Sequence, residues 1–398
     1  MKKTLVALAA LASVSAFAQT SVVLDGYIDR SYLATNSTLD TGDTKTIASA
    51  AGTTTIGIKV REDLGAGLSA GLSINTDWSE LGGATQSVTV ANAATGGFAN
   101  SQSFLDITSA SMGTLRLGSP NNFTLTNSTA ISTPAFSTGV GSQYSSAYSY
   151  ASGLGTGATG KGGTVDTSMY GIGTTANTTG TASHSTARAI RIANTIQYSS
   201  PVIQGFSLHL GLTQANNNVT AASTVGNTAG VNETAIRYTN GPVDAMYSTI
   251  KYTIGSNGIT QSVPTVSSGV TTFVADTNAA QTSTQNLLGV QYQVMPNLKL
   301  NLGSGTFSSS TGLAQGNTRN YGGTYTMGQV DFMLLTSATN DTTTTNIDRK
   351  MTGYGVNYNL SKTTRAYVRM DNLNYYSNGA AVAGSSVKRS AFGVSKSF

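Results

Sequence analysis

Hydrophobic and polar residues alternate along most of this chain with a period of two. One segment places Phe206, Leu208, Leu210 and Leu212 on one parity and His209 on the other. A period of two with one apolar face is typical of a β-strand. We predict about sixteen such strands, each of roughly ten residues. They are centred on residues 22–28, 56–61, 68–75, 103–108, 114–118, 192–198, 206–212, 233–239, 243–253, 288–294, 298–302, 319–326, 330–337, 351–358, 364–375 and 387–398.

The connections between these segments alternate in length. The long, polar ones are 35–52, 79–99, 119–190, 216–231, 255–284, 308–317, 340–349 and 378–386. The short ones are 62–65, 111–113, 240–242, 295–297, 328 and 360–362. Long loops on one side and short turns on the other are typical of outer-membrane barrels. The sequence therefore predicts an all-β fold, a sixteen-stranded antiparallel transmembrane β-barrel, with both chain ends on the short-turn side.

Residues 1–18 have the pattern of a secretory signal peptide. Lys2 and Lys3 precede a short apolar run over 4–14, and residues 16–18 give an A-x-A cleavage site. We expect the mature chain to begin at Gln19 and residues 19–398 to form the barrel. A transmembrane helix needs about 20 apolar residues, and the sequence contains no run of that length.

Composition and charge narrow the classes of protein. With 45 Gly, 6 Pro and abundant Thr and Ser, the chain is rich in strand and turn formers. It has no cysteine, which excludes disulfides and thiolate metal sites. Without Lys2 and Lys3 the chain has 20 Lys and Arg against 17 Asp and Glu, a net charge of +3. That charge is too small to indicate nucleic acid as a partner.

A soluble, exported β-protein, such as an adhesin sandwich, is the alternative fold. Its strands also alternate, but its loops have no reason to sort by length, and it need not finish on an aromatic strand. Here Phe392, Val394 and Phe398 share one parity in the last strand. The loop pattern therefore favours the barrel.

Six segments of the chain contain recognisable motifs. They are 21–29 (SVVLDGYID), 57–70, 113–118 (GTLRLG), 191–201 (RIANTIQYSSP), 358–364 (YNLSKTT) and 391–398 (AFGVSKSF). Taken together, they resemble those of the Gram-negative general porins of the beta-proteobacterial type. Residues 21–29 resemble the opening strand of that family, and residues 57–70 resemble its G-x-K-G-x-E-D-L-G-x-G-L-x-A hairpin, which is the most specific match.

This resemblance implies a trimeric barrel in the outer membrane whose third external loop folds inward. It also implies that the assembly machinery reads Phe398 and that outer-membrane lipid and lipopolysaccharide surround the barrel. Three positions depart from the family pattern: Asp25 replaces a usual Tyr, Arg61 a usual Gly and Ser119 a usual Arg. The family's charge map therefore cannot be carried over in detail.

The charged residues of the polar parity are the candidates for lining a pore. A lipid-facing Arg or Lys at mid-depth costs about 2–4 kcal/mol, so these side chains should face the lumen. The pore-lining and constriction candidates, including one acid on the long loop, are Asp29, Lys59, Arg61, Arg116, Asp166, Arg191, Arg365 and Arg369. We expect Arg116 and Arg191 to lie at the base of the 119–190 loop, opposite Lys59 and Arg61. Alternatively, these bases solvate the mouth or pair with Asp29 and Asp106.

Residues 119–190 form a connection far longer than the roughly 12–15 residues usual for a loop without structure. We interpret it as the inward-folded constriction loop, with residues 133–136 as a rigid turn at its tip. An external loop of small residues is the alternative. The segment contains a single acid, Asp166, against Lys161 and Arg188. Cation-preferring porins usually crowd acids there, so the sequence predicts weak selectivity or a preference for anions.

Catalytic and cofactor motifs are not found. The two histidines, His184 and His209, are not accompanied by a G-x-S-x-G sequence, and the Gly-rich stretch 153–163 lacks the residues of a phosphate loop. We expect no enzymatic activity, cofactor or metal. A general diffusion porin for small hydrophilic solutes and ions is favoured. A substrate-selective channel and a non-channel adhesin remain alternatives, and no ladder of lumen-facing aromatics marks a sugar channel.

Overall fold

The computed structural model is a β-barrel. It describes residues 20–38, 43–77, 99, 101–142, 171–173, 186–188, 194–213, 230–254, 261–267, 270–276, 281–309, 315–342, 347–377 and 380–398. Within these residues no helix is long and apolar enough to cross a membrane. The expected signal peptide lies outside the described residues.

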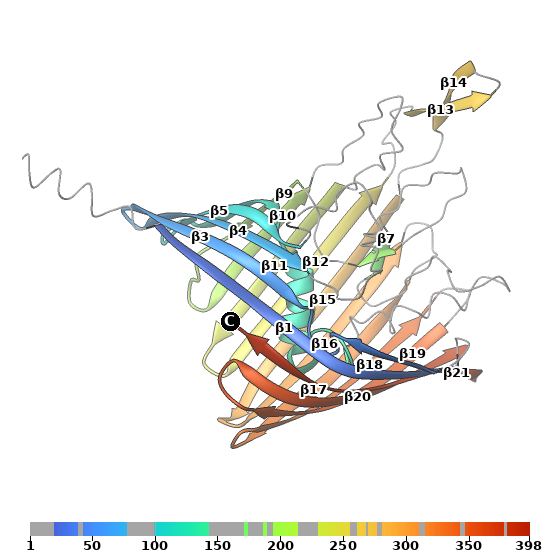
Figure 1. The fold of residues 1–398 in the computed structure, drawn as a ribbon. Coiled ribbons are helices and arrows are strands. Elements are labelled where there is room, and N and C mark those ends of the chain that lie inside the picture. Colours follow the sequence, from blue (N-terminus) through green and yellow to red (C-terminus); the bar gives the residue numbers. More distant parts are fainter. Residues whose placement is uncertain are drawn as a thin grey trace, which may run out of the picture.

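One large antiparallel sheet closes on itself to form the wall (Figure 1). Sixteen strands make up the wall: β1 (Thr20–Ser37), β3 (Thr55–Gly65), β4 (Leu68–Asp77), β5 (Ser103–Ser109), β6 (Gly113–Ser119), β9 (Thr195–Ser199), β10 (Phe206–Thr213), β11 (Gly230–Asn240), β12 (Val243–Ile254), β15 (Gln281–Met295), β16 (Leu298–Ser309), β17 (Gln315–Met327), β18 (Val330–Asp341), β19 (Ile347–Asn359), β20 (Thr364–Ser377) and β21 (Ala380–Ser397). Each strand pairs with its neighbours in this order, and β21 pairs with β1 over residues 27–37 of β1. The predicted sixteen-stranded antiparallel barrel is confirmed.

A seventeenth strand, β2 (Thr44–Ala48), lies within a stretch for which we predicted only a loop, 35–52. It pairs with residues 31–35 of β1, while β3 pairs with residues 20–27 of the same edge. Residues 49–54 interrupt the line between β2 and β3. The described residues also contain two small hairpins outside the wall, β7 (Gly171–Gly173) with β8 (Thr186–Arg188) and β13 (Gln261–Ser267) with β14 (Val270–Asp276).

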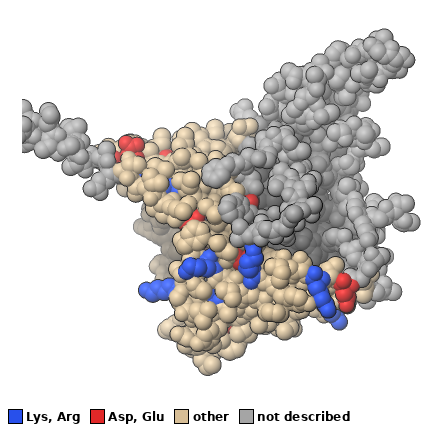
Figure 2. Space-filling view, in the orientation of Figure 1, with Lys and Arg blue, Asp and Glu red and all other residues tan. Residues whose placement is uncertain are grey.

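The alternation predicted from the sequence separates an outer from an inner face. Leu208 and Leu210 on β10 are 39% and 41% exposed on the outside, while Ser207 of the same strand, on the opposite parity, is buried. The same holds for Leu300 and Leu302 on β16, which alternate with the buried Asn301. Among the described residues visible in Figure 2, most of the surface is uncharged. Apolar outer positions and polar inner ones are the pattern of a barrel that contacts lipid.

Short turns join the strands at one end of the barrel. Gly113 begins β6 with a φ of +92°, a conformation that residues with a Cβ rarely adopt. An added Cβ there would lie 2.1 Å from the carbonyl oxygen of Ser199 on the neighbouring strand. The same end holds Phe398, whose backbone exchanges two hydrogen bonds with Gly26.

Candidate functional site

After β6 the chain turns into the barrel. Residues 120–142, here called the inward segment, contain α2 (Phe123–Thr126), the π-helix η1 (Asn127–Ser132) and the 3₁₀-helix η2 (Pro134–Phe136). Asn122 caps α2 because its side-chain oxygen accepts the N–H of Leu125 at 2.8 Å. Pro134 begins η2 and fixes its first turn. Residues 120–142 of the 119–190 loop therefore fold inward, as expected.

The inward segment buries its apolar side chains against the inner wall. Phe123 and Ile131 form a cluster with Ala235 of β11 and Met246 of β12. Phe136 is fully buried, so residues 133–136 pack against the wall and do not project as a tip. The hydrophobic core of this protein thus lies inside the barrel, between the segment and the strands.

Side-chain amides connect the middle of the segment to three strands. Asn127 Nδ2 donates to the carbonyl oxygens of Met246 and Leu287, both at 2.9 Å, and to Ser248 Oγ at 3.0 Å. Asn301 Nδ2 donates to the carbonyl of Ser132 at 2.6 Å. The Asn301 bond satisfies a carbonyl that the irregular segment leaves open, and the Asn127 bonds attach the segment to β12 and β15.

Glycines on the inner face make room for the segment. An added Cβ at Gly289 of β15 would lie 2.2 Å from Asn127 Oδ1, and one at Gly353 of β19 would lie 2.7 Å from the Cα of Gly141. Both distances are shorter than any normal contact, so only glycine permits the observed approach. We call the inner face of β11 to β21, which the segment contacts, the covered wall.

A buried ion pair fixes the far end of the segment. Asp371 on β20 and Arg389 on β21 form a salt bridge in which both side chains are less than a tenth exposed. Asp371 Oδ2 also accepts the N–H of Gly141 at 2.7 Å, and Arg389 donates to the carbonyl of Gly139 at 3.3 Å. Both members of the pair therefore contact the segment directly.

Residues 49–54 form a second inner connection beside that far end. The Asp29 carboxylate accepts the N–H groups of Ala51 at 2.6 Å and Gly52 at 3.0 Å, and Tyr367 donates its hydroxyl to the other oxygen. The N–H of Val140 donates to the carbonyl of Ala50 at 2.8 Å. Asp29 thus supports the connection that the inward segment packs against.

The inner face of β3 to β6 and of residues 20–27 of β1, here called the open wall, contains exposed charges. Lys59 pairs with Asp25 at 2.7 Å, and Arg61 pairs with Asp106 at 3.0 Å. The Lys59 and Arg61 side chains are 53% and 49% exposed. Arg116 lies next to Asp106 in the strand register, and its guanidinium lies 5.2 Å from the ring centre of Phe104. Three cations therefore share two carboxylates on this wall.

The structure places the predicted site residues in three groups. Lys59, Arg61 and Arg116 lie together on the open wall, so Arg116 is beside Arg61 and not opposite it. Arg365 also faces inward and donates to Ser395 Oγ and Tyr27 Oη. Arg191 and Asp166 lie outside the described residues.

Asp29 and Arg369 differ from the expectation that they line the open lumen. Both lie on the inner side, as parity requires, but Asp29 is fully buried and Arg369 is 3% exposed. Arg369 donates to the carbonyl of Ala51 at 3.3 Å and lies over the Phe136 ring. Their charges are covered by residues 49–54 and the inward segment, which the strand pattern does not reveal.

Sequence reasoning missed the residues that hold the segment in place. These are Asn127, Glu233, Asp371 and Arg389. An acid of lumen-facing parity, such as Glu233 on β11, is the signal that could have identified one of them.

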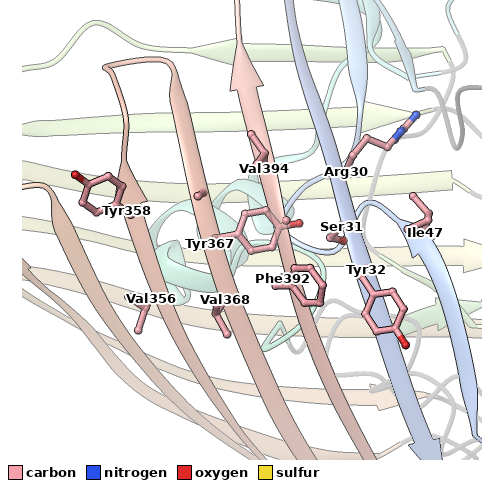
Figure 3. Close-up of a pocket in the computed structure, with 12 residues that line it drawn as sticks. Arg30, Ser31, Tyr32, Ile47, Val356, Tyr358, Tyr367, Val368, Phe392 and Val394 are labelled. Atoms are coloured by element: carbon pink, nitrogen blue, oxygen red, sulfur yellow. The ribbon is translucent and has the colours of Figure 1, made fainter.

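The outer wall has a groove of about 770 Å³ over β1, β19, β20 and β21. Tyr32 and Phe392 stack there with ring centres 5.4 Å apart, next to Val356 and Val368 (Figure 3). Arg30 points away from these rings and donates to Ser49, Thr54 and the carbonyl of Asp29, in the gap between β2 and β3. The groove is apolar and lies outside the lumen. In the described residues no group of acidic or histidine side chains could hold a metal ion.

Comparisons with known proteins agree on one family and one fold. A family model described as Gram-negative porin matches residues 4–378. The anion-selective porin from Comamonas acidovorans is similar in structure, with a TM-score of 0.66 and 20% identity over 96% of this chain and 100% of that one. The DcaP channel of Acinetobacter baumannii gives 0.58 and 12% over 95% and 97%. OmpF of Salmonella typhi gives 0.55 and 11% over 95% and 97%. No curated protein sequence matches the chain.

Proposed function

The chain belongs to the Gram-negative porins, the non-enzymatic channels of the outer membrane, and from this premise we propose that its pore prefers anions weakly. Small hydrophilic solutes and ions diffuse through a water-filled lumen bounded by the open wall and the inward segment. The observation that carries the proposed preference is the pairing of a basic open wall with an inward segment that has no ionisable residue from 120 to 142.

Charged rings and constrictions set the selectivity of such pores. On the open wall, Lys59, Arg61 and Arg116 meet Asp25 and Asp106, which leaves one positive charge, and Arg365 adds another. Because the segment contributes no negative charge from 120 to 142, the field in the passage stays positive. The similar porin from Comamonas acidovorans is described as anion-selective, which supports the same preference here.

Reversal potentials in a KCl gradient across a planar bilayer test this proposal. We expect chloride to be favoured in the wild type and the preference to reverse in the Lys59→Glu, Arg116→Glu double variant. Lys362→Glu, in a short turn at the barrel end, is the matched control and should retain the wild-type sign. Cation selectivity in the wild type, or no change in the double variant, would contradict the proposed role of these residues. Block by one solute class at low concentration would favour the substrate-selective alternative.

We also propose that three barrels assemble as a homotrimer. Both β5 and β6 contain 7 residues, whereas a membrane-spanning strand needs about 9–11. Their outer side chains are nonetheless apolar, as Leu105 and Leu117 show. A neighbouring barrel that packs against this low part of the wall would bury the apolar outer side chains of β5 and β6, which are too short to span the lipid alone. Cross-linking in the native membrane tests this, and a monomeric product alone would exclude it.

Outer-membrane lipid and lipopolysaccharide are proposed to contact the tall side of the wall. Towards the loop end of the strands, the outward-facing positions are occupied by basic residues in place of apolar ones. These residues, all exposed, are Lys45, Lys251, Arg319, Lys350 and Lys388. Near the membrane interface a basic side chain costs only about 0–1 kcal/mol, and it can pair with lipid phosphates. The test is the amount of glycolipid that co-purifies with the Lys45→Glu, Lys388→Glu double variant. If this variant retains as much glycolipid as the wild type, the proposed lipid contact is wrong.

Export and assembly complete the proposal. Residues 1–18 would be removed on export, and mass spectrometry of the purified protein should show Gln19 at the amino terminus. Phe398 is 45% exposed beside the β1 edge, where the assembly machinery could bind it. Phe398→Ala should reduce the amount of folded barrel in the membrane, and an unchanged amount would exclude this role.

A further inference from the structure

One buried carboxylate contacts the inward segment where its first helix begins. Glu233 lies on the inner face of β11 and is 4% exposed. Its Oε2 accepts the N–H of Phe123 at 2.9 Å, and its Oε1 accepts the N–H of Thr124 at 2.6 Å. The first N–H groups of a helix have no partner within the helix. Both oxygens of one side chain are therefore occupied by the first turn of α2.

The surroundings of Glu233 are arranged for this contact. Gly211 is its register partner on β10, and an added Cβ there would lie 3.2 Å from Glu233 Oε2. The ion pairs of the described residues do not include Glu233. A buried charge without a cation is costly unless hydrogen bonds compensate it, and here the compensating donors belong to the inward segment.

The position of Glu233 decides the direction of the segment. Asn121, at the entry, is held by Gln102 and Gln197 close to the end of β6. Glu233 is the first charged residue among these contacts, and its strand β11 lies three strands beyond β6 around the barrel. Beyond it, Asn127 bonds to β12 and β15. Glu233 thus lies where the chain leaves β6 and begins to follow the covered wall.

We propose that Glu233 is a positioning residue for the pore: it holds α2 against β11 and thereby fixes the width of the passage between the segment and the open wall. This inference rests on the proposed diffusion function. The segment from 120 to 142 has no charge of its own, so Glu233 at its start and Asp371 at its far end supply the charged attachments. Loss of the first attachment frees the part of the segment nearest the open wall.

The experiment compares Glu233→Gln with the wild type in single-channel recordings. Glutamine has nearly the same shape but only one acceptor oxygen, so one of the two N–H groups loses its partner. An unsatisfied buried N–H raises the population of the displaced segment by about tenfold, which should appear as frequent brief closures and a wider spread of conductance levels. Glu62→Gln on β3, outside these contacts, is the control and should behave as the wild type.

A cross-link separates positioning from a general loss of structure. The chain has no cysteine, and Asn127 Nδ2 lies 3.0 Å from Ser248 Oγ. Asn127→Cys with Ser248→Cys, oxidised in the Glu233→Gln background, should restore the quiet wild-type current, and reduction should bring the closures back. The same cysteine pair without Glu233→Gln shows what the cross-link does alone.

The outcomes are distinguishable. If Glu233→Gln records like the wild type, or if closures persist after oxidation, the positioning role of Glu233 is wrong. If the Gln variant fails to fold, Glu233→Asp, which keeps the charge but shortens the reach, should show intermediate closures, and wild-type currents from it would contradict the inference. A wild type that conducts no ions would instead contradict the proposed function.

Discussion

The covered wall and the open wall belong to one sheet but differ in what their inner residues contact. The covered wall has glycines such as Gly289 and Gly353 and neutral amides, and it contacts the inward segment closely. The open wall has Lys59 and Arg61, whose side chains are 53% and 49% exposed, together with Arg116 and the carboxylates of Asp25 and Asp106. One half of the lumen is thus shaped for packing and the other for contact with ions. Variants of the two walls should therefore affect different properties, stability and passage width on one and selectivity on the other.

The largest effect should come from the buried pair at the end of the covered wall. Asp371→Asn leaves Arg389 buried without its carboxylate, and breaking such a pair costs about 3–5 kcal/mol. Urea unfolding in lipid vesicles measures this loss. Asp25→Asn breaks an exposed pair on the open wall and should cost about 0–1 kcal/mol. Equal losses of unfolding free energy in the two variants would contradict the proposed difference between the walls. Adding Arg389→Met to Asp371→Asn should recover part of the stability.

An intermediate effect is expected where the segment lies on glycine. Gly289→Val places side-chain atoms where Asn127 now lies, and overpacking of this kind costs about 1–3 kcal/mol. The segment should move towards the open wall, so single-channel conductance should fall. Ser304→Val, on the outer face of the neighbouring strand β16, is the control. A conductance equal to that of the wild type would mean that the close approach at Gly289 does not limit the passage.

The smallest effect should follow from one charge on the open wall. Asp106→Asn removes the carboxylate that Arg61 pairs with and leaves the covered wall unchanged. A unit charge acts with about 1 kcal/mol at 4 Å in water, so chloride preference should rise by a factor of up to about five. Reversal potentials measure the shift. A shift towards potassium would contradict the proposed direction. A loss of unfolding free energy above about 1 kcal/mol would show that Asp106 also stabilises the barrel, and that the open wall does not act on selectivity alone.

Residue parity predicted the wall well because each strand is a local, periodic pattern. Leu208 and Leu210 face out as expected, and the turn at 240–242 lies where β11 meets β12. The covered wall could not be predicted in the same way. Asn127, Glu233 and Asp371 act through contacts between residues more than 100 positions apart in sequence, and the inward segment has no period of its own. Asp29 was identified as facing inward, but only the path of residues 49–54 shows that it is covered.

The pairing of β1 with β21 has a consequence for how the molecule forms. The register joins Tyr27 to Ser397 and Ser37 to Val387, so the two edges that meet are almost the whole chain apart. Contacts at such separation form slowly, and until this seam forms each edge presents unpaired backbone groups that could recruit a strand from another molecule. Closure must therefore come late, and a newly exported chain has to be shielded from its neighbours until the last strand meets the first.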